Sequence, residues 1–89
     1  MKKKPLLVTT EFKGVFYGYG VPSSEENIEL EDCRNAIYWA TTRGFLELAT
    51  TGPNKNSRIG SKAQKVILRK VTSVTEVTQE AAKVWDALP

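Results

Sequence analysis

The sequence predicts a mostly β (α+β) fold: an antiparallel sheet or small open barrel of five to six strands, with one C-terminal helix packed on it. Residues 6–13 alternate with a period of two, and residues 65–77 form a long β run whose second half is rich in valine and threonine. Only the last segment changes to apolar residues spaced three and four apart, the helical period. The 89 residues fit one small β-rich domain, 1–89.

Residues 4–21 are typical of a β-hairpin. Lys13-Gly14 can form a two-residue turn, because glycine accepts the positive φ that such turns require. The register that follows places three pairs on one face: Phe12 with Val15, Thr10 with Tyr17, and Val8 with Tyr19. Gly18 and Gly20 interrupt the second strand, which predicts a bulge, a bend or the close approach of another backbone.

The middle of the chain predicts shorter elements. Residues 22–27 have the composition of a loop, and 28–31 alternate apolar and acidic residues, as in a short strand with one wet face. A turn is expected at 32–35. We expect 36–49 to form a second hairpin with a four-residue connection, because 36–40 are aromatic and β-branched and 45–49 return as their partner. A long loop follows it.

The C-terminal segment carries helix signals. Thr78 is a good N-cap, and Glu80 lies in the first turn, where it complements the helix dipole. One apolar stripe joins Ala81, Val84, Trp85 and Leu88. A helix of about ten residues is too short to stand alone in water, so we expect it to dock on the sheet through Trp85.

The composition excludes several chemistries. The chain has no histidine and one cysteine, Cys33, so it can form neither an internal disulfide nor a Cys/His zinc site, and it has no imidazole base. Alternating acids at Glu29, Glu31 and Asp32 leave a carboxylate dyad open, but they also fit the wet face of a strand. Free cysteine is usually buried and inert. We therefore expect no enzyme activity, no catalytic residue, no metal and no cofactor.

Charge is mild overall but uneven. The net charge is +3, with five acids and no base in residues 25–32, and six bases and no acid in residues 55–70. The basic segment fits an anion or the acidic segment of a neighbouring subunit. Because this basic segment contains no aromatic residue, nucleic acid is a less favoured partner than a small anion or a protein. A small domain without disulfides has a thin core, so we expect a homo-oligomer.

The N-terminus does not predict export or a membrane. Met1 to Lys4 resembles the basic start of a signal peptide, but the apolar run 5–8 is too short for one. No segment reaches the roughly 20 apolar residues of a membrane span. A single free cysteine without an export signal indicates the cytoplasm.

Two groups of residues are candidates for ligand binding. Gly60-Ser61-Lys62 has the ingredients of a phosphate loop in the wrong order and leads into a strand, which argues against a nucleotide triphosphatase. It can still contribute to an anion cradle formed by Ser57, Arg58, Ser61 and Lys62. The second group combines two arginines with two aromatics able to stack on a base: Arg34, Tyr38, Trp39 and Arg43. In a strand, one of the two aromatics faces the core.

Segments along nearly the whole chain resemble an uncharacterised family of small phage and prophage proteins. The segments are FKGVFYGY at 12–19, RNAIYW at 34–39, LATTGP at 48–53, SRIG at 57–60, VTSV at 71–74, EAA at 80–82 and Trp85. The resemblance implies a phage-like setting in the cytoplasm of a bacterial host, and it transfers no catalytic residue. Small phage proteins include structural accessories and inhibitors of host defence, some of them oligomers that trap a nucleotide signal without cleaving it.

The expected function is therefore a non-enzymatic, homo-oligomeric binder that sequesters a small anionic, nucleotide-like ligand. The charged segments also leave open a protein-interaction module that inhibits a host protein, or a phage structural accessory protein.

Overall fold

The computed structural model describes residues 3–11, 14–39, 44 and 46–88. Its elements are β1 (Lys4–Thr10), β2 (Gly14–Gly20), β3 (Ile28–Tyr38), α1 (Glu47–Thr50), β4 (Arg58–Ile59), β5 (Ala63–Leu68), β6 (Val71–Glu76) and α2 (Gln79–Asp86). The six strands form an antiparallel sheet in the order β4-β3-β2-β1-β6, and β5 pairs with β3 beside β4. The predicted fold class is confirmed.

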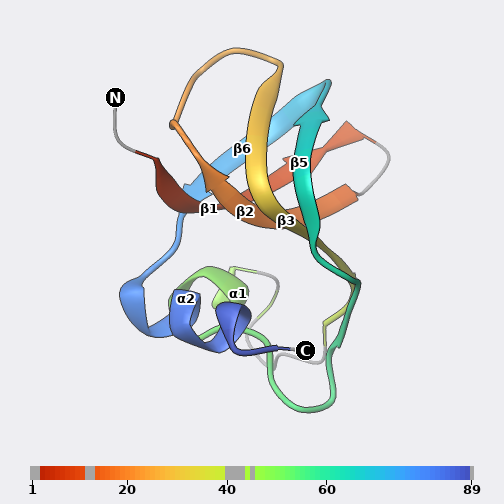
Figure 1. Cartoon of the computed structure of the whole chain (residues 1–89), viewed down its shortest axis with the longest axis vertical. Coiled ribbons are helices and arrows are strands. Elements are labelled where there is room, and N and C mark those ends of the chain that lie inside the picture. Colours follow the sequence, from red (N-terminus) through yellow and green to blue (C-terminus); the bar gives the residue numbers. More distant parts are fainter. Residues whose placement is uncertain (1–2, 12–13, 40–43, 45, 89) are drawn as a thin grey trace.

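The sheet is strongly curled (Figure 1). Strands β5 and β6 are joined only by Arg69 and Lys70, yet β5 pairs with β3 while β6 pairs with β1. Two ends of the strand order are therefore held close by a short connection in which Lys70 has a φ of 56°. The strands do not close into a barrel, because β5 and β6 are not paired to each other.

Two apolar clusters hold the fold together. An inner cluster lies within the curl: Leu6, Val8, Ile28, Leu30, Cys33 and Leu68. On the other face of β1 and β2, a helix-side cluster joins Leu7 and Tyr17 to Leu48 of α1 and Trp85 of α2. Both helices lie together on this side of the sheet (Figure 1). Among the described helices, none is long and apolar enough to cross a membrane.

The C-terminal helix follows its prediction. The Thr78 Oγ1 accepts a hydrogen bond from the backbone N–H of Ala81 at 3.1 Å, as an N-cap should. Glu80 lies in the first turn, and Ala81 and Trp85 are fully buried. The helix docks through Trp85, as expected.

The register predicted for the first hairpin is wrong. Val8 pairs with Phe16 and Leu7 pairs with Tyr17, so Val8 faces the inner cluster and Tyr17 faces the helices. Thr10 pairs with Gly14, which leaves three residues rather than two in the connection. The predicted turn fails because Gly14 belongs to β2 itself. Phe12 and Lys13 lie outside the described residues.

Glycines allow β2 and β3 to approach closely, which is one of the three alternatives that the sequence left open for Gly18 and Gly20. A Cβ atom at Gly20 would lie 2.7 Å from the backbone oxygen of Glu29, and one at Gly18 would lie 2.9 Å from the Cβ of Leu30. Larger residues would push the two strands apart.

The turn expected at 32–35 is wrong, because β3 continues through it. Glu31 pairs with Tyr19 and Arg34 with Tyr17, so β3 carries one more residue than β2 over this stretch. Asp32 takes a φ of 51°, which absorbs the extra residue as a bulge. The strand continues because its edge is paired by β5 and then by β4.

The second hairpin predicted over 36–49 is also wrong. Residues 47–50 form α1, and β4 rather than this segment pairs with the end of β3. The backbone N–H of Thr78 donates to the oxygen of Ala49 at 2.9 Å, so contacts with the C-terminal segment hold α1. The β run expected over 65–77 is divided at Arg69-Lys70 into β5 and β6.

Candidate functional site

Tyr38 and Arg58, from the two different candidate groups, are cross-strand neighbours. Tyr38 ends β3 and its partner in register is Arg58 of β4. Tyr38 is 55% exposed and Arg58 is exposed as well. The backbone N–H of Gly60 donates to the oxygen of Asn35 at 2.8 Å, which fixes the segment after β4 against β3. An aromatic ring and a guanidinium thus share one exposed edge of the sheet.

A compact turn precedes β4. The Asn54 Oδ1 accepts hydrogen bonds from the Asn56 backbone N–H at 3.0 Å and from the Ser57 hydroxyl at 3.1 Å. The Ser57 N–H also donates to the Asn54 oxygen at 3.0 Å. This Asx-type turn presents Lys55 to solvent just before Arg58. The Ser57 hydroxyl is hydrogen-bonded within the turn.

Ser61 and Lys62 extend this edge without converging on Tyr38. Both are exposed between β4 and β5. The next residue, Ala63, pairs with Cys33 near the middle of β3, whereas Tyr38 lies at its end. Four to five residues along a strand correspond to about 15 Å. The anion cradle predicted from Ser57 to Lys62 is therefore an open edge.

The other group of candidate residues is divided by burial. Arg34 is only 3% exposed and lies opposite Tyr17, so it belongs to the interior. Trp39 is partly buried against the helix-side cluster, which leaves Tyr38 as the exposed aromatic. Arg43 lies outside the described residues.

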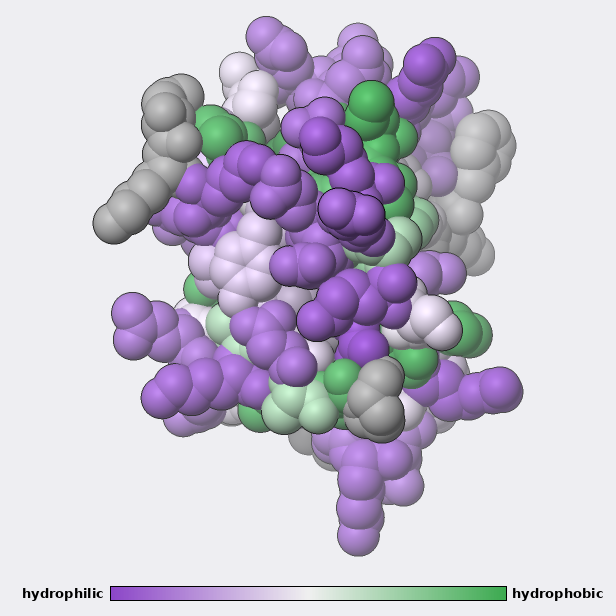
Figure 2. Space-filling view, in the orientation of Figure 1, coloured by the Kyte–Doolittle hydropathy of each residue, from purple (hydrophilic) through white to green (hydrophobic). Residues whose placement is uncertain are grey.

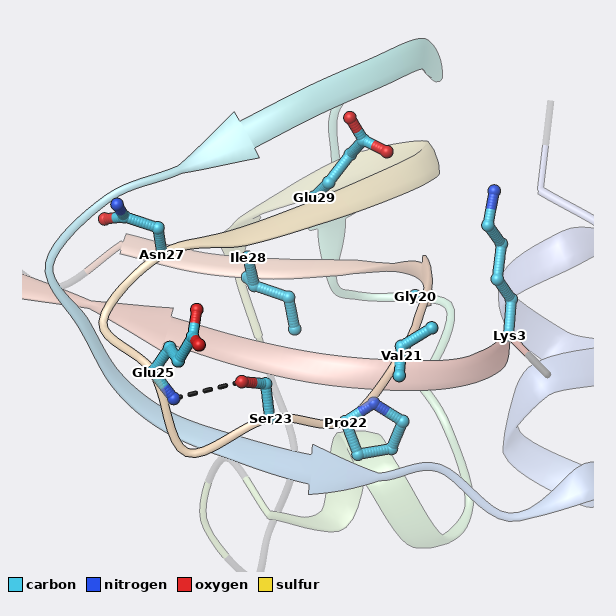
Figure 3. A pocket seen from close by; sticks show the side chains of 9 residues that line it. All are labelled: Lys3, Gly20, Val21, Pro22, Ser23, Glu25, Asn27, Ile28 and Glu29. Atoms are coloured by element: carbon cyan, nitrogen blue, oxygen red, sulfur yellow. Dashed lines mark hydrogen bonds between the residues drawn. The ribbon is translucent and has the colours of Figure 1, made fainter. Parts of the chain in front are cut away.

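A hollow lies away from these candidates. It has a volume of about 290 Å³ and is lined by Lys3, Gly20, Val21, Pro22, Ser23, Glu25, Asn27, Ile28 and Glu29 (Figure 3). An adjoining hollow of about 210 Å³ shares Ser23 and Glu25 and reaches β6. Lys3 forms an ion pair with Glu31, so the carboxylates of Glu25 and Glu29 set the charge of the larger hollow, here called the acidic groove. Sequence reasoning missed it, although the acidic run in 25–32 was its signal.

Asp86 connects α2 to the sheet. Its carboxylate accepts hydrogen bonds from the hydroxyls of Tyr17 at 3.0 Å and Tyr19 at 2.5 Å. Burial, together with these hydrogen bonds, raises the pKa of both tyrosines above the ordinary value. The Tyr17 ring also stacks on Trp85. No sequence pattern indicates this cluster, because its members lie far apart in the chain.

Comparison with known protein families identifies the family of this chain. A family model described as a domain of unknown function, DUF6948, matches residues 3–85. The chain belongs to the DUF6948 family. Neither the curated proteins nor the solved structures contain a match to it. The DUF6948 match covers nearly the whole fold and assigns no residue a role.

Reactive groups of this DUF6948 domain are few. Burial raises the pKa of the Cys33 thiol to about 11, and the residue lies in the inner cluster. The expected burial of Cys33 is confirmed. Glu31 pairs with Lys3, which lowers the pKa of its carboxyl. Within the described part of the chain, no three acidic, cysteine or histidine side chains gather as a metal site would require.

Proposed function

We propose that this DUF6948 chain is a non-enzymatic binding module that holds a small anionic, nucleotide-like ligand at the exposed edge formed by the end of β3 and β4. The observation that carries the proposal is the pairing of Tyr38 with Arg58. A guanidinium offers paired N–H donors to a phosphate, and a tyrosine ring offers a face on which a base can stack.

The charge at this edge supports the proposal. Within the described residues, neither Arg58 nor Lys62 forms an ion pair, so neither charge is neutralised by the fold. Lys62 lies about 15 Å from Tyr38 along β3, so it would meet a second phosphate group only in an extended ligand. Arg34, being buried, is not part of this surface.

The setting is proposed from the resemblance to small phage proteins. In this proposal the ligand is a signal of a bacterial host's defence, and the chain lowers its free concentration by binding without cleavage. The proposed homo-oligomer in the host cytoplasm would bind ligand at each copy whose edge is left uncovered.

Native mass spectrometry of the gently purified protein tests the proposal first. We expect an adduct of small mass that is lost on denaturation, and its mass then identifies the ligand. Binding of that ligand should weaken at least tenfold in a chain carrying Arg58→Ala and Lys62→Ala. The matched control carries Lys65→Ala and Arg69→Ala, which removes the same charge from exposed positions of β5 and its end. Equal binding by both variants would contradict the proposal.

A second candidate function is a protein-interaction module that inhibits a host protein, or a structural accessory role in a phage particle. It is favoured by large exposed apolar side chains: Ile37 is 57%, Tyr38 55% and Ile67 61% exposed. Interfaces combine such side chains with arginine. A stable complex with one host or particle protein, disrupted by Ile37→Ser and formed without any small adduct, would favour this function over ligand binding.

A further inference from the structure

Strand β3 connects two chemically different ends of the molecule. It begins at Ile28, which lines the acidic groove, and ends at Tyr38, beside β4. Its eleven residues make ten steps of about 3.3 Å, or roughly 33 Å along the strand. The longest extent of the molecule is 31 Å. In Figure 1 the loop between β2 and β3 is accordingly at the top, and the segment between α1 and β4 is at the bottom.

The groove itself is lined by unneutralised acids, and the exposed Arg69 and Lys70 of the β5–β6 connection lie beyond it at the same end of the molecule. Glu25, Glu26 and Glu29 are exposed, and none forms an ion pair within the described residues. Among the described residues that line the groove, Lys3 is the one base, and it is engaged by Glu31. The groove therefore presents net negative charge around a concave surface.

The opposite end is basic. Lys55 at the Asx-type turn and Arg58 of β4 are exposed, and neither forms an ion pair in the described part of the chain. Figure 2 shows hydrophilic side chains projecting from the lower end of the molecule. Since the Debye length is about 8 Å at physiological salt, charges at the two ends of one copy scarcely interact. Only a second molecule can bring them together.

Apolar groups accompany both charges. Val21 and Pro22 are partly exposed in the lining of the acidic groove, next to the buried Ile28 (Figure 3). At the basic end, Ile37 and Tyr38 are more than half exposed. A contact between the two ends would bury an apolar centre within a rim of opposite charges, which is the usual anatomy of a protein interface.

We propose that the partner of the acidic groove is the basic end of a second copy of this chain, with Lys55 and Arg58 of one copy meeting Glu25 and Glu29 of the next. The contact joins different surfaces, so it is head-to-tail, and it generates a ring or an open chain of copies. It stands on charge and shape and does not require the proposed ligand. Because both use Arg58, an anion bound there competes with assembly.

Charge exchange tests this assembly by sedimentation velocity. At low salt, the wild-type mass should rise with protein concentration and fall to the monomer in about 0.5 M salt, where the Debye length is roughly 4 Å. Variants Glu25→Lys/Glu29→Lys and Lys55→Glu/Arg58→Glu should each be monomeric, because their two ends carry the same sign. An equimolar mixture should associate again, since each variant then complements the other at both contacts.

The control variant Glu11→Lys/Glu80→Lys makes the same charge change at exposed positions outside the groove and should assemble like the wild type. Circular dichroism verifies the fold of each variant. If charge reversal unfolds the chain, Glu25→Gln/Glu29→Gln should weaken association at least tenfold.

Three results would overturn the assembly. The first is a wild type that stays monomeric at about 100 µM, a protein concentration that would saturate an interface with a micromolar Kd. The second is a charge-reversed variant that still self-associates. The third is an equimolar mixture of the two variants that stays monomeric. Pyrophosphate binding to the monomeric Glu25→Lys/Glu29→Lys variant, which keeps Arg58, is measured separately by calorimetry. If this variant does not bind pyrophosphate while the wild type still assembles, the result counts against the ligand proposal alone.

Discussion

Replacing Trp85 with phenylalanine should destabilise the fold more than its small change in size suggests. The indole is fully buried and stacks on Tyr17 with ring centroids 4.7 Å apart and 3° between the planes. Its Nε1–H donates a buried hydrogen bond to the backbone oxygen of Leu48 in α1 at 2.9 Å. Phenylalanine keeps an aromatic face against Tyr17 but removes the donor and part of the ring.

The magnitude follows from these two losses. A buried carbonyl left without its donor costs about 1–3 kcal/mol. The missing part of the ring leaves a void on the order of 40 Å³, which at about 24 cal/mol per Å³ costs about 1 kcal/mol. We therefore expect Trp85→Phe to lower the free energy of unfolding by about 2–4 kcal/mol, from a total of about 4–13 kcal/mol for a domain of this length.

Urea unfolding followed by circular dichroism measures this loss. With an m value of about 1 kcal/mol/M, the midpoint should fall by about 2–4 M. Trp39→Phe is the matched control, because Trp39 is only partly buried at the rim of the same cluster. It should cost less than about 1 kcal/mol, since partial burial forfeits less packing. Equal costs for the two variants, or no loss at Trp85, would refute the role assigned to the indole hydrogen bond.

Two further predictions concern titratable groups. Burial of Cys33 raises its thiol pKa to about 11. The folded chain should therefore react with Ellman's reagent at pH 8 far more slowly than the urea-unfolded chain does. Equal reaction rates would show that the thiol is accessible in the folded chain. Folding raises the pKa of Tyr17 and Tyr19 above 10.0. As the pH rises, the unfolded chain therefore loses its hydroxyl protons before the folded chain does. The stabilisation from these two hydroxyls is complete below pH 10 and is lost as the pH rises further. Denaturant titrations from pH 8 to 11.5 should show this loss in the wild type and a smaller one in Tyr17→Phe/Tyr19→Phe, whereas parallel profiles would exclude the tyrosine hydroxyls as its cause.

The sequence predicts elements whose pattern has one dominant face. The stripe of α2 and its Thr78 cap are such local signals, and both are confirmed. In β1, by contrast, Leu6, Leu7 and Val8 are all fully buried, because the inner cluster takes one face and the helices take the other. Alternation then carries no information about register, and the hairpin was predicted with the wrong pairing.

Other features depend on contacts between distant segments. Residues 45–49 were predicted to form a strand, but the indole of Trp85 and the backbone of Thr78 stabilise residues 47–50 as α1. Tyr38 and Arg58 were recognised as candidates separately, and only the pairing of β3 with β4 makes them neighbours. The burial of Arg34 depends on the bulge at Asp32, whose positive φ the sequence does not reveal.

The position of β1 between β2 and β6 also affects synthesis of the chain. One edge of β1 stays without its partner until residues 71–76 have left the ribosome, and the helix-side face is uncovered until residues 79–86 follow. Unpaired strand edges and uncovered apolar faces promote aggregation of nascent chains. The domain can therefore complete its fold only after residues 79–86 have emerged, and truncations that remove α2 should be found in inclusion bodies or degraded.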